Sequence, residues 1–139
     1  MASLSKSIFA GVALLSVAGL IAAQTPAPAP ALTRTIVTKG DVSVPNREGV
    51  VARVEITPGG AAGWHTHPGD EISYVADGEA TVMIAGQAPR KVAAGEGFVI
   101  PAGIVHNARN DGTTTVRVIG VYVVEKGKPL ASPAAEPAK

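Results

Sequence analysis

The chain has 139 residues and no cysteine, which excludes disulfide bonds, thiolate metal sites and cysteine nucleophiles. Its 12 basic and 11 acidic residues form no cluster of positive charge, so nucleic acid, which needs such clusters, is not an expected partner. The length suits a single domain, and 16 glycines and 11 prolines favour turns and short strands over long helices.

The N-terminal segment is predicted to be a secretory signal peptide over residues 1–23. Lys6 precedes an apolar run, IFAGVALLSVAGLI, at residues 8–21, and two alanines follow it. The run is shorter than the roughly 20 apolar residues that a membrane span needs, which favours a cleaved signal over a retained anchor. We therefore expect a periplasmic or extracellular protein that has no membrane association after cleavage.

Segments rich in proline and alanine flank the central part of the chain. Residues 24–31 predict an extended spacer, because alternating proline and alanine disfavour both helix and sheet. Residues 126–139 have a similar composition and predict a flexible tail. One folded domain is therefore expected over residues 32–125.

The apolar pattern inside that domain has a period of two residues, which is typical of half-buried strands. The predicted strands lie at residues 50–57, 71–76, 79–85, 97–103 and 113–124. Asp77 and Gly78, between the second and third of them, form a hairpin signal. Many short strands separated by glycine and proline turns predict an all-β antiparallel sandwich or barrel.

The last of these strands predicts a contact between subunits. The second half of residues 113–124 is apolar on both faces, and one small barrel cannot cover both. We therefore expect a homodimer in which sheets pack face to face, with residues 33–38 as a further part of the contact.

The three histidines of the chain point to a metal site. His65 and His67 are two residues apart, so in a strand both side chains project from the same face. Glu71 follows a Pro-Gly turn and can return to the same place, and a closed barrel can bring His106 beside them. Three imidazoles and one carboxylate suit a divalent first-row metal, and the donor set is compatible with Fe, Mn, Ni, Co, Cu or Zn. Four protein ligands on an octahedral ion would leave two positions for substrate or dioxygen.

Two spaced motifs contain these four residues. The first motif consists of Gly59, His65, His67, Glu71 and Gly78. The second motif consists of Gly95, Pro101, Gly103, His106 and Asn110. Both spacings resemble those of the cupins, and the resemblance covers residues 50–124. It implies a double-stranded β-helix (jelly-roll) barrel, with His65, His67, Glu71 and His106 as the metal ligands.

The other residues of the motifs have expected structural roles. The glycines at positions 59, 78, 95 and 103 are predicted to supply positive φ or bulge geometry at strand corners. Asn110 is expected to close a turn. Strand alternation places Ser73 and Val75 on the same face as Glu71, where they could line the cavity, and directs Trp64 away from the metal.

The resemblance to quercetin dioxygenase-like cupins implies a metal-dependent oxygenase that acts on a small chelating organic substrate. Glu71 could itself serve as a catalytic base, whereas the lack of another histidine or carboxylate near the motifs argues against an elaborate acid–base relay. A germin-like oxalate oxidase is a variant of this oxygenase hypothesis. Two alternatives stay open because one fold hosts many functions: a non-oxidative metal-dependent lyase or isomerase, and a module that binds metal or a small ligand without turnover.

Overall fold

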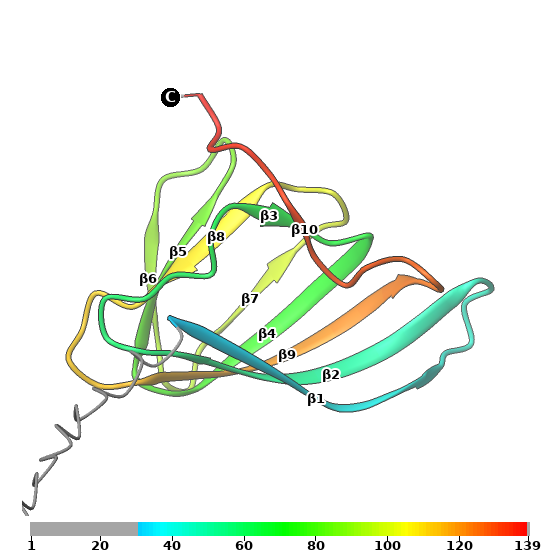
Figure 1. Cartoon of the computed structure of the whole chain (residues 1–139), viewed down its shortest axis with the longest axis horizontal. Coiled ribbons are helices and arrows are strands. Elements are labelled where there is room, and N and C mark those ends of the chain that lie inside the picture. The colour runs from blue at the N-terminus through cyan, green and yellow to red at the C-terminus, as the bar shows by residue number, and fades with distance from the viewer. Residues whose placement is uncertain (1–30, 139) are drawn as a thin grey trace, which may run out of the picture.

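The computed structural model describes residues 31–138, which form ten strands (Figure 1). They are β1 (Leu32–Asp41), β2 (Arg47–Ile56), β3 (His65–Thr66), β4 (Gly69–Asp77), β5 (Glu79–Ile84), β6 (Arg90–Ala93), β7 (Gly97–Ile100), β8 (His106–Arg109), β9 (Val116–Glu125) and β10 (Ser132–Pro133). Within residues 31–138 no helix has the length and apolar character that crossing a membrane requires. The predicted signal peptide, and the predicted spacer up to residue 30, lie outside the described residues.

The strands form two five-stranded antiparallel sheets that face one another (Figure 1). Sheet A has the order β1-β2-β9-β4-β7, and sheet B has the order β10-β3-β8-β5-β6. The predicted all-β antiparallel class is therefore confirmed. Strands that are distant in sequence become neighbours, as when β9 inserts between β2 and β4.

The core lies between the two sheets, and strand alternation builds it. On β2 the apolar residues at positions 50, 52, 54 and 56 all point inward and are buried. On β9 the even-numbered residues from Val116 to Val124 are buried in the same way. Phe98 and Ile100 of β7 and Val82 of β5 complete the contact between the sheets. This packing is why the period of two in the sequence predicts strands correctly.

The predicted hairpin at Asp77 and Gly78 is wrong. The turn exists, and Gly78 has the positive φ of 78° that favours glycine. However, β4 before the turn pairs with β7 and β9 in sheet A, whereas β5 after the turn pairs with β6 and β8 in sheet B. The Asp-Gly turn therefore carries the chain from one sheet to the other, and the hairpin partner of β5 is β6.

The predicted turn residues have the expected roles. The glycines at positions 59, 95 and 103 also adopt positive φ. Asn110 closes the turn before β9, because its Nδ2 donates to the carbonyls of Ile56 and Thr114 at 2.9 and 2.7 Å. Its Oδ1 accepts a hydrogen bond from the backbone N–H of Gly112 at 2.9 Å. Asn110 is fully buried, so these bonds satisfy a group that would otherwise be costly to bury.

The C-terminal segment is packed over part of its length, where a loose tail was predicted. Residues of β10 pair with β3, and the backbone N–H of Ala134 donates to the carbonyl of Trp64 at 2.9 Å. Leu130 packs against Tyr122 and its neighbours in a second apolar cluster. In Figure 1 this segment, drawn in red, runs from the end of β9 to the side of β3.

The outer face of sheet A, which points away from sheet B, is apolar across several strands. Ile72, Tyr74 and Val99 are 51%, 51% and 59% exposed there. Ile72 lies opposite Val99 on one side and Val121 on the other, so these side chains form a continuous row. The second half of β9 is therefore apolar on both faces, and its outer face is only partly covered.

Candidate metal centre

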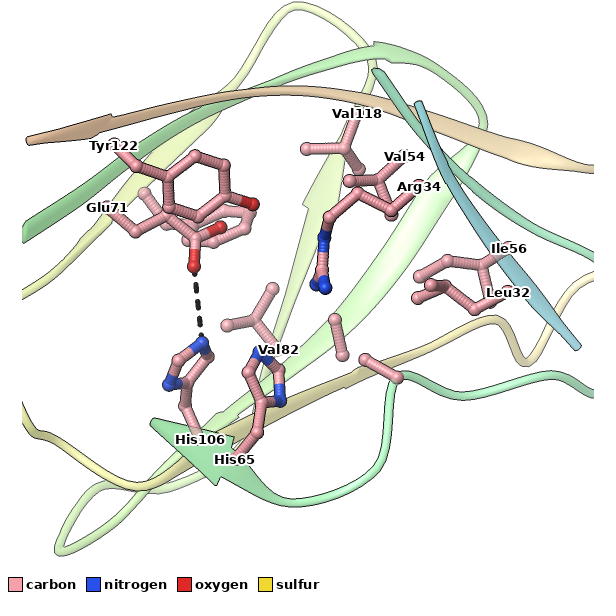
Figure 2. Close-up of a pocket in the computed structure, with 13 residues that line it drawn as sticks. Leu32, Arg34, Val54, Ile56, His65, Glu71, Val82, His106, Val118 and Tyr122 are labelled. Atoms are coloured by element: carbon pink, nitrogen blue, oxygen red, sulfur yellow. Dashed lines mark hydrogen bonds and ion pairs between the residues drawn. The ribbon is translucent and has the colours of Figure 1, made fainter. Parts of the chain in front are cut away.

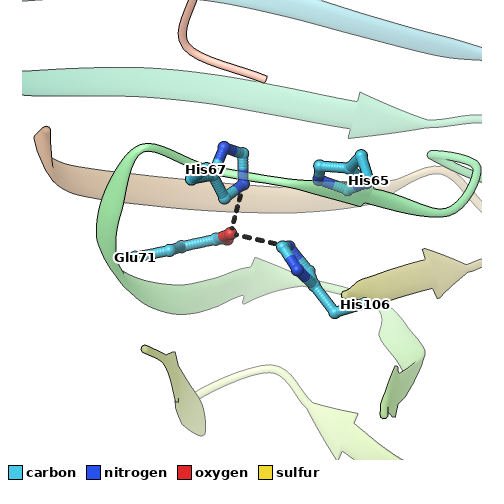
Figure 3. A group of neighbouring side chains, drawn as sticks. All are labelled: His65, His67, Glu71 and His106. Carbon is cyan, nitrogen blue, oxygen red and sulfur yellow. Dashed lines mark hydrogen bonds and ion pairs between the residues drawn. The ribbon is translucent and has the colours of Figure 1, made fainter. Parts of the chain in front are cut away.

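Four buried side chains converge at one point between the sheets: His65, His67, Glu71 and His106 (Figure 3). His65 lies on β3 directly opposite His106 on β8, and Glu71 comes from β4 of the other sheet. One ligand atom from each residue lies within 4.8 Å of all the others. Atoms bound to one ion at about 2.1 Å are about 3.0 Å apart when adjacent and about 4.2 Å apart when opposite. The widest pair in the cluster can therefore exceed the distance between opposite ligands of an octahedral ion by about 0.6 Å, so the side chains must move closer together to hold an ion.

Backbone carbonyls orient the three imidazoles. The Nδ1–carbonyl distances are 2.7 Å from His65 to Gly63, 2.6 Å from His67 to Leu130 and 2.9 Å from His106 to Ile104. A carbonyl can only accept a hydrogen bond, so Nδ1 is the nitrogen that carries the proton in each ring. In a neutral ring Nε2 is then a lone-pair donor, and this arrangement is characteristic of histidines that bind metals.

The four residues fit a divalent transition metal. Nε2 of His67 lies 2.8 Å from Oε2 of Glu71, and Nε2 of His106 lies 3.2 Å from the same oxygen. With Nδ1 protonated, the Nε2 atoms of two neutral rings would direct their lone pairs at Oε2 of Glu71. This oxygen carries no proton, so the contacts would be repulsive. The buried His67 Nε2 accordingly has no hydrogen-bond partner among the described residues. A cation at the centre removes this repulsion, and three nitrogens with one oxygen suit a first-row ion.

Glu71 is held in its ionised form. Burial raises its pKa, but hydrogen bonds that His106 and His67 donate when their rings are charged, together with the hydrogen bond from Ser73, outweigh burial and hold the pKa well below its usual range. The Ser73 hydroxyl donates to Oε1 at 2.6 Å, which leaves Oε2 facing the histidines. Ser73, which strand alternation placed on this face, therefore orients a predicted metal ligand.

The stability of the metal-free protein is expected to fall as pH drops from about 6.5 to about 4. Burial, together with the charges of neighbouring histidines, lowers the pKa of His65 from 6.5 to about 4. Between these values the unfolded chain binds a proton at His65 that the folded chain does not bind, so acid favours unfolding. Urea titrations of chelator-treated protein should show a loss on the order of 1–3 kcal/mol across this window. His65→Gln should show a smaller slope, and an equal slope would refute the assignment.

The C-terminal segment positions His67, because the Leu130 carbonyl accepts the hydrogen bond from its Nδ1. Truncation after Lys128 is expected to lower metal affinity about 10- to 100-fold, the usual effect of removing groups that orient metal ligands. Competition with a chromophoric chelator measures the change. Truncation after Ala134 keeps β10 and is the matched control, which should bind metal like the full chain. Equal affinity of both truncated proteins would contradict the role of Leu130.

A small cavity of about 30 Å³, partly open to solvent, lies beside the four converging side chains (Figure 2). His65, Glu71 and His106 form one end. The apolar wall includes Val54, Ile56, Val82, Phe98 and Val118. Two polar side chains, Arg34 of β1 and Tyr122 of β9, also reach this space. Burial, with a contribution from the charge of Glu71, raises the pKa of Tyr122 to about 12, so its hydroxyl is neutral at physiological pH.

Sequence reasoning missed Arg34 and Tyr122 as lining residues. Alternation along β9 could have identified Tyr122, because it shares the inward face with Val118 and Val124. The ring of Tyr122 lies 4.8 Å from that of His67. For Arg34 the signal was weaker, because the strand pattern of β1 is irregular and most of its residues are exposed. Only the pairing of Arg34 with Val54 fixes which face of β1 turns inward.

The chain matches a family model described as Cupin domain over residues 52–124, which is more than half of its length. The putative germin-like protein 3-2 of Oryza sativa subsp. japonica is 40% identical over 77 residues, covering 52% of this chain and 35% of that protein. The acireductone dioxygenase of Rhodopseudomonas palustris (strain TIE-1) is 37% identical over 59 residues, covering 40% and 36%. The chain thus spans about a third of the length of these curated relatives.

Solved structures show the same fold. A protein with a double-stranded β-helix domain from Klebsiella pneumoniae subsp. pneumoniae MGH 78578 has a TM-score of 0.63 at 22% identity, covering 81% of this chain and 85% of that chain. An oxalate oxidase in complex with the substrate analogue glycolate has a TM-score of 0.53 at 30% identity, covering 64% and 57%. The predicted double-stranded β-helix is therefore confirmed.

Proposed function

Because this chain belongs to the cupin family, we propose that it is a metal-dependent oxygenase-like enzyme that acts on a small chelating organic substrate. The observation that carries the proposal is the position of the four convergent ligands at one end of a cavity that opens to solvent. A purely structural metal site would be closed on all sides, whereas this site has a small cavity beside the ligands that is open to solvent, so part of a second molecule could reach the ion.

The metal would be one divalent transition ion held by His65, His67, Glu71 and His106. When bound, such an ion polarises a chelating substrate and, if it is redox-active, activates dioxygen. The chain supplies an apolar wall that excludes water, a neutral hydroxyl on Tyr122 and a charged group on Arg34. Glu71 would be the proton acceptor only if it left the ion, since Ser73 and two histidines hold it there.

The relatives support this choice without fixing the reaction. Two of the proteins that resemble this chain are named as a dioxygenase and an oxidase, and both cover only part of it. A non-oxidative lyase or isomerase would use the same four ligands, and so would a module that binds metal without turnover. The lyase or isomerase has no specific observation in its favour, because the described residues place no further histidine or carboxylate in the cavity.

Oxygen consumption distinguishes the three functions. The protein is reconstituted without oxygen with Fe(II) or Mn(II) and then exposed to oxygen with a panel of flavonols, diketones and oxalate. Uptake above that of a His106→Ala variant supports the oxygenase. Product formation without oxygen would overturn it in favour of the lyase or isomerase, and metal binding without any product would favour the binding module.

We also propose that the protein is exported and that two copies associate through the outer face of sheet A. The apolar run at residues 8–21 supports export, and N-terminal sequencing of protein from the periplasm or medium would test it. The exposed row of Val99, Ile72 and Val121 supports association, because a two-fold axis would place each row against its copy.

Light scattering at micromolar concentration should report a dimer for the wild type and a monomer for Ile72→Lys. The lysine would place a charge in the centre of the apolar row, where its desolvation opposes association. Val44→Lys is the matched control, because Val44 is 51% exposed and lies in the turn between β1 and β2. A monomeric wild type, or a dimeric Ile72→Lys protein, would contradict the proposed interface.

A further inference from the structure

Arg34 is the one described arginine that lines the cavity beside the metal ligands. Its side chain points from β1 into the cavity, and its guanidinium lies between Tyr122 and His65 (Figure 2). Its charge lowers the pKa of both neighbours, which agrees with this position. Leu32, two residues earlier, points the same way and packs against the core. The placement of Arg34 is therefore fixed by the strand and by its pairing with Val54.

The guanidinium has no counter-charge in the described part of the chain. Its Nε is buried and has no hydrogen-bond partner there, and no ion pair of Arg34 is formed with residues 31–138. Arginine stays charged under all physiological conditions, so the group cannot avoid the cost of its partial burial by losing a proton. The five other described arginines contrast with it, because none of them has a buried nitrogen without a partner. A half-buried guanidinium that is directed into a cavity and has no counter-charge indicates a binding group for an anionic ligand.

The charges of the site define the ligand. With a divalent ion bound, three neutral imidazoles, ionised Glu71 and Arg34 leave a local charge of about +2, calculated from the ordinary charges of these groups. Tyr122 is neutral and adds a hydrogen-bond donor. The carboxylate of Glu71 is already held by Ser73 and the histidines, so it does not neutralise Arg34. A small anion that reaches both Arg34 and the ion would balance this charge.

We propose that Arg34 binds the carboxylate of a small organic acid whose second oxygen group reaches the metal. The inference rests on the proposed metal-dependent function and specifies the substrate class of the same site. The planar guanidinium can form two parallel hydrogen bonds with a carboxylate, which fixes its orientation as well as its charge. The apolar wall of Val54, Val82 and Val118 surrounds this position and strengthens the interaction by excluding water. Arg34 is therefore the residue that selects acids over neutral chelators.

Calorimetric titration with oxalate, glycolate and the neutral analogue glycolamide tests the assignment. Wild type and Arg34→Gln are compared, both loaded with Mn(II) and both treated with a chelator. The expected result for the loaded wild type is a preference for the acids, and Arg34→Gln should bind them at least about 30-fold more weakly, with unchanged metal content. Binding of glycolamide should change little. Arg34→Lys keeps the charge without the planar fork and should recover only part of the affinity.

Arg53→Gln is the matched control, because Arg53 lies on the neighbouring strand β2 and is exposed on the outer face. It should bind the acids like the wild type. Equal acid affinity of the Arg34→Gln and wild-type proteins would overturn the inference, and so would a loaded wild type that binds neither acid. Thermal unfolding verifies that the variants fold, and Arg34→Gln should unfold no lower than wild type because it loses an unpaired charge.

The chelator-treated samples separate the two proposals. In one outcome, the protein binds the acids weakly without metal, loses this binding in Arg34→Gln, and fails to retain any metal. That result would support the anion site and refute the metal-dependent function. A protein that retains metal and consumes oxygen with neutral substrates, but binds no acid, would support the metal-dependent function and refute the anion site.

Discussion

Replacing Glu71 with alanine is expected to lower the affinity for Mn(II), Fe(II) and Zn(II) by more than about 100-fold. The change removes the only negatively charged ligand and leaves three neutral nitrogens. The effect should therefore exceed the 10- to 100-fold loss that follows removal of a group that merely orients a ligand. Competition with a chromophoric chelator measures it, with elemental analysis of the purified variant as an independent check.

Two further variants give this experiment a graded scale. Ser73→Ala removes only the hydrogen bond to Oε1 of Glu71 and should cost about tenfold in metal affinity. Glu79→Ala removes an exposed carboxylate that pairs with Lys91 and should change nothing. If Glu71→Ala bound metal within threefold of wild type, the carboxylate would not be a ligand.

Gly69→Ala is expected to lower the free energy of unfolding by about 2–4 kcal/mol, one of the larger losses that a single small side chain can cause. Gly69 begins β4, where a Cβ would overlap the carbonyl oxygen of Val123 and lie 2.6 Å from Cα of Val124. Both obstacles are backbone atoms of β9, so no side-chain rotation relieves the overlap. The two strands must separate, and Glu71 lies only two residues away on β4.

Urea denaturation of the metal-free protein measures this loss, and metal affinity should fall together with stability. Gly40→Ala is the matched control, since a Cβ at Gly40 meets nothing within 4 Å and its φ is not positive. That control should unfold within about 0.5 kcal/mol of wild type. Wild-type stability of Gly69→Ala would show that β4 and β9 are not in close contact at this position.

The sequence predicts which four side chains converge, because the identity and the spacing of these residues both carry chemical meaning. His65 lies on β3 and His67 follows directly after that strand, so their spacing of two residues brings both rings to one place, and the structure brings His106 directly opposite His65. Glycines with positive φ mark the corners, so Gly78 and Gly103 could be assigned to turns from the sequence alone. These features depend on local geometry, which a short stretch of sequence determines.

Features that depend on pairing between distant strands could not be predicted in this way. The Asp77-Gly78 turn was assigned to a hairpin because local signals do not state which sheet receives the next strand. The inward orientation of Arg34 depends on its register with β2, and the carbonyl of Leu130 that orients His67 belongs to the backbone. Backbone atoms are the same in every residue, so no sequence pattern identifies which carbonyl will accept the hydrogen bond that orients a histidine.

X-ray absorption spectroscopy of protein loaded with one equivalent of Mn(II), Fe(II) or Zn(II) shows directly which atoms bind the ion. We expect a first shell that includes three imidazole nitrogens and one carboxylate oxygen at about 2.0–2.2 Å, with the multiple scattering of three rings. His106→Ala should lose one ring from that shell. A shell made of oxygens alone, or a wild-type spectrum that the His106→Ala variant reproduces, would contradict a metal centre built from these four residues.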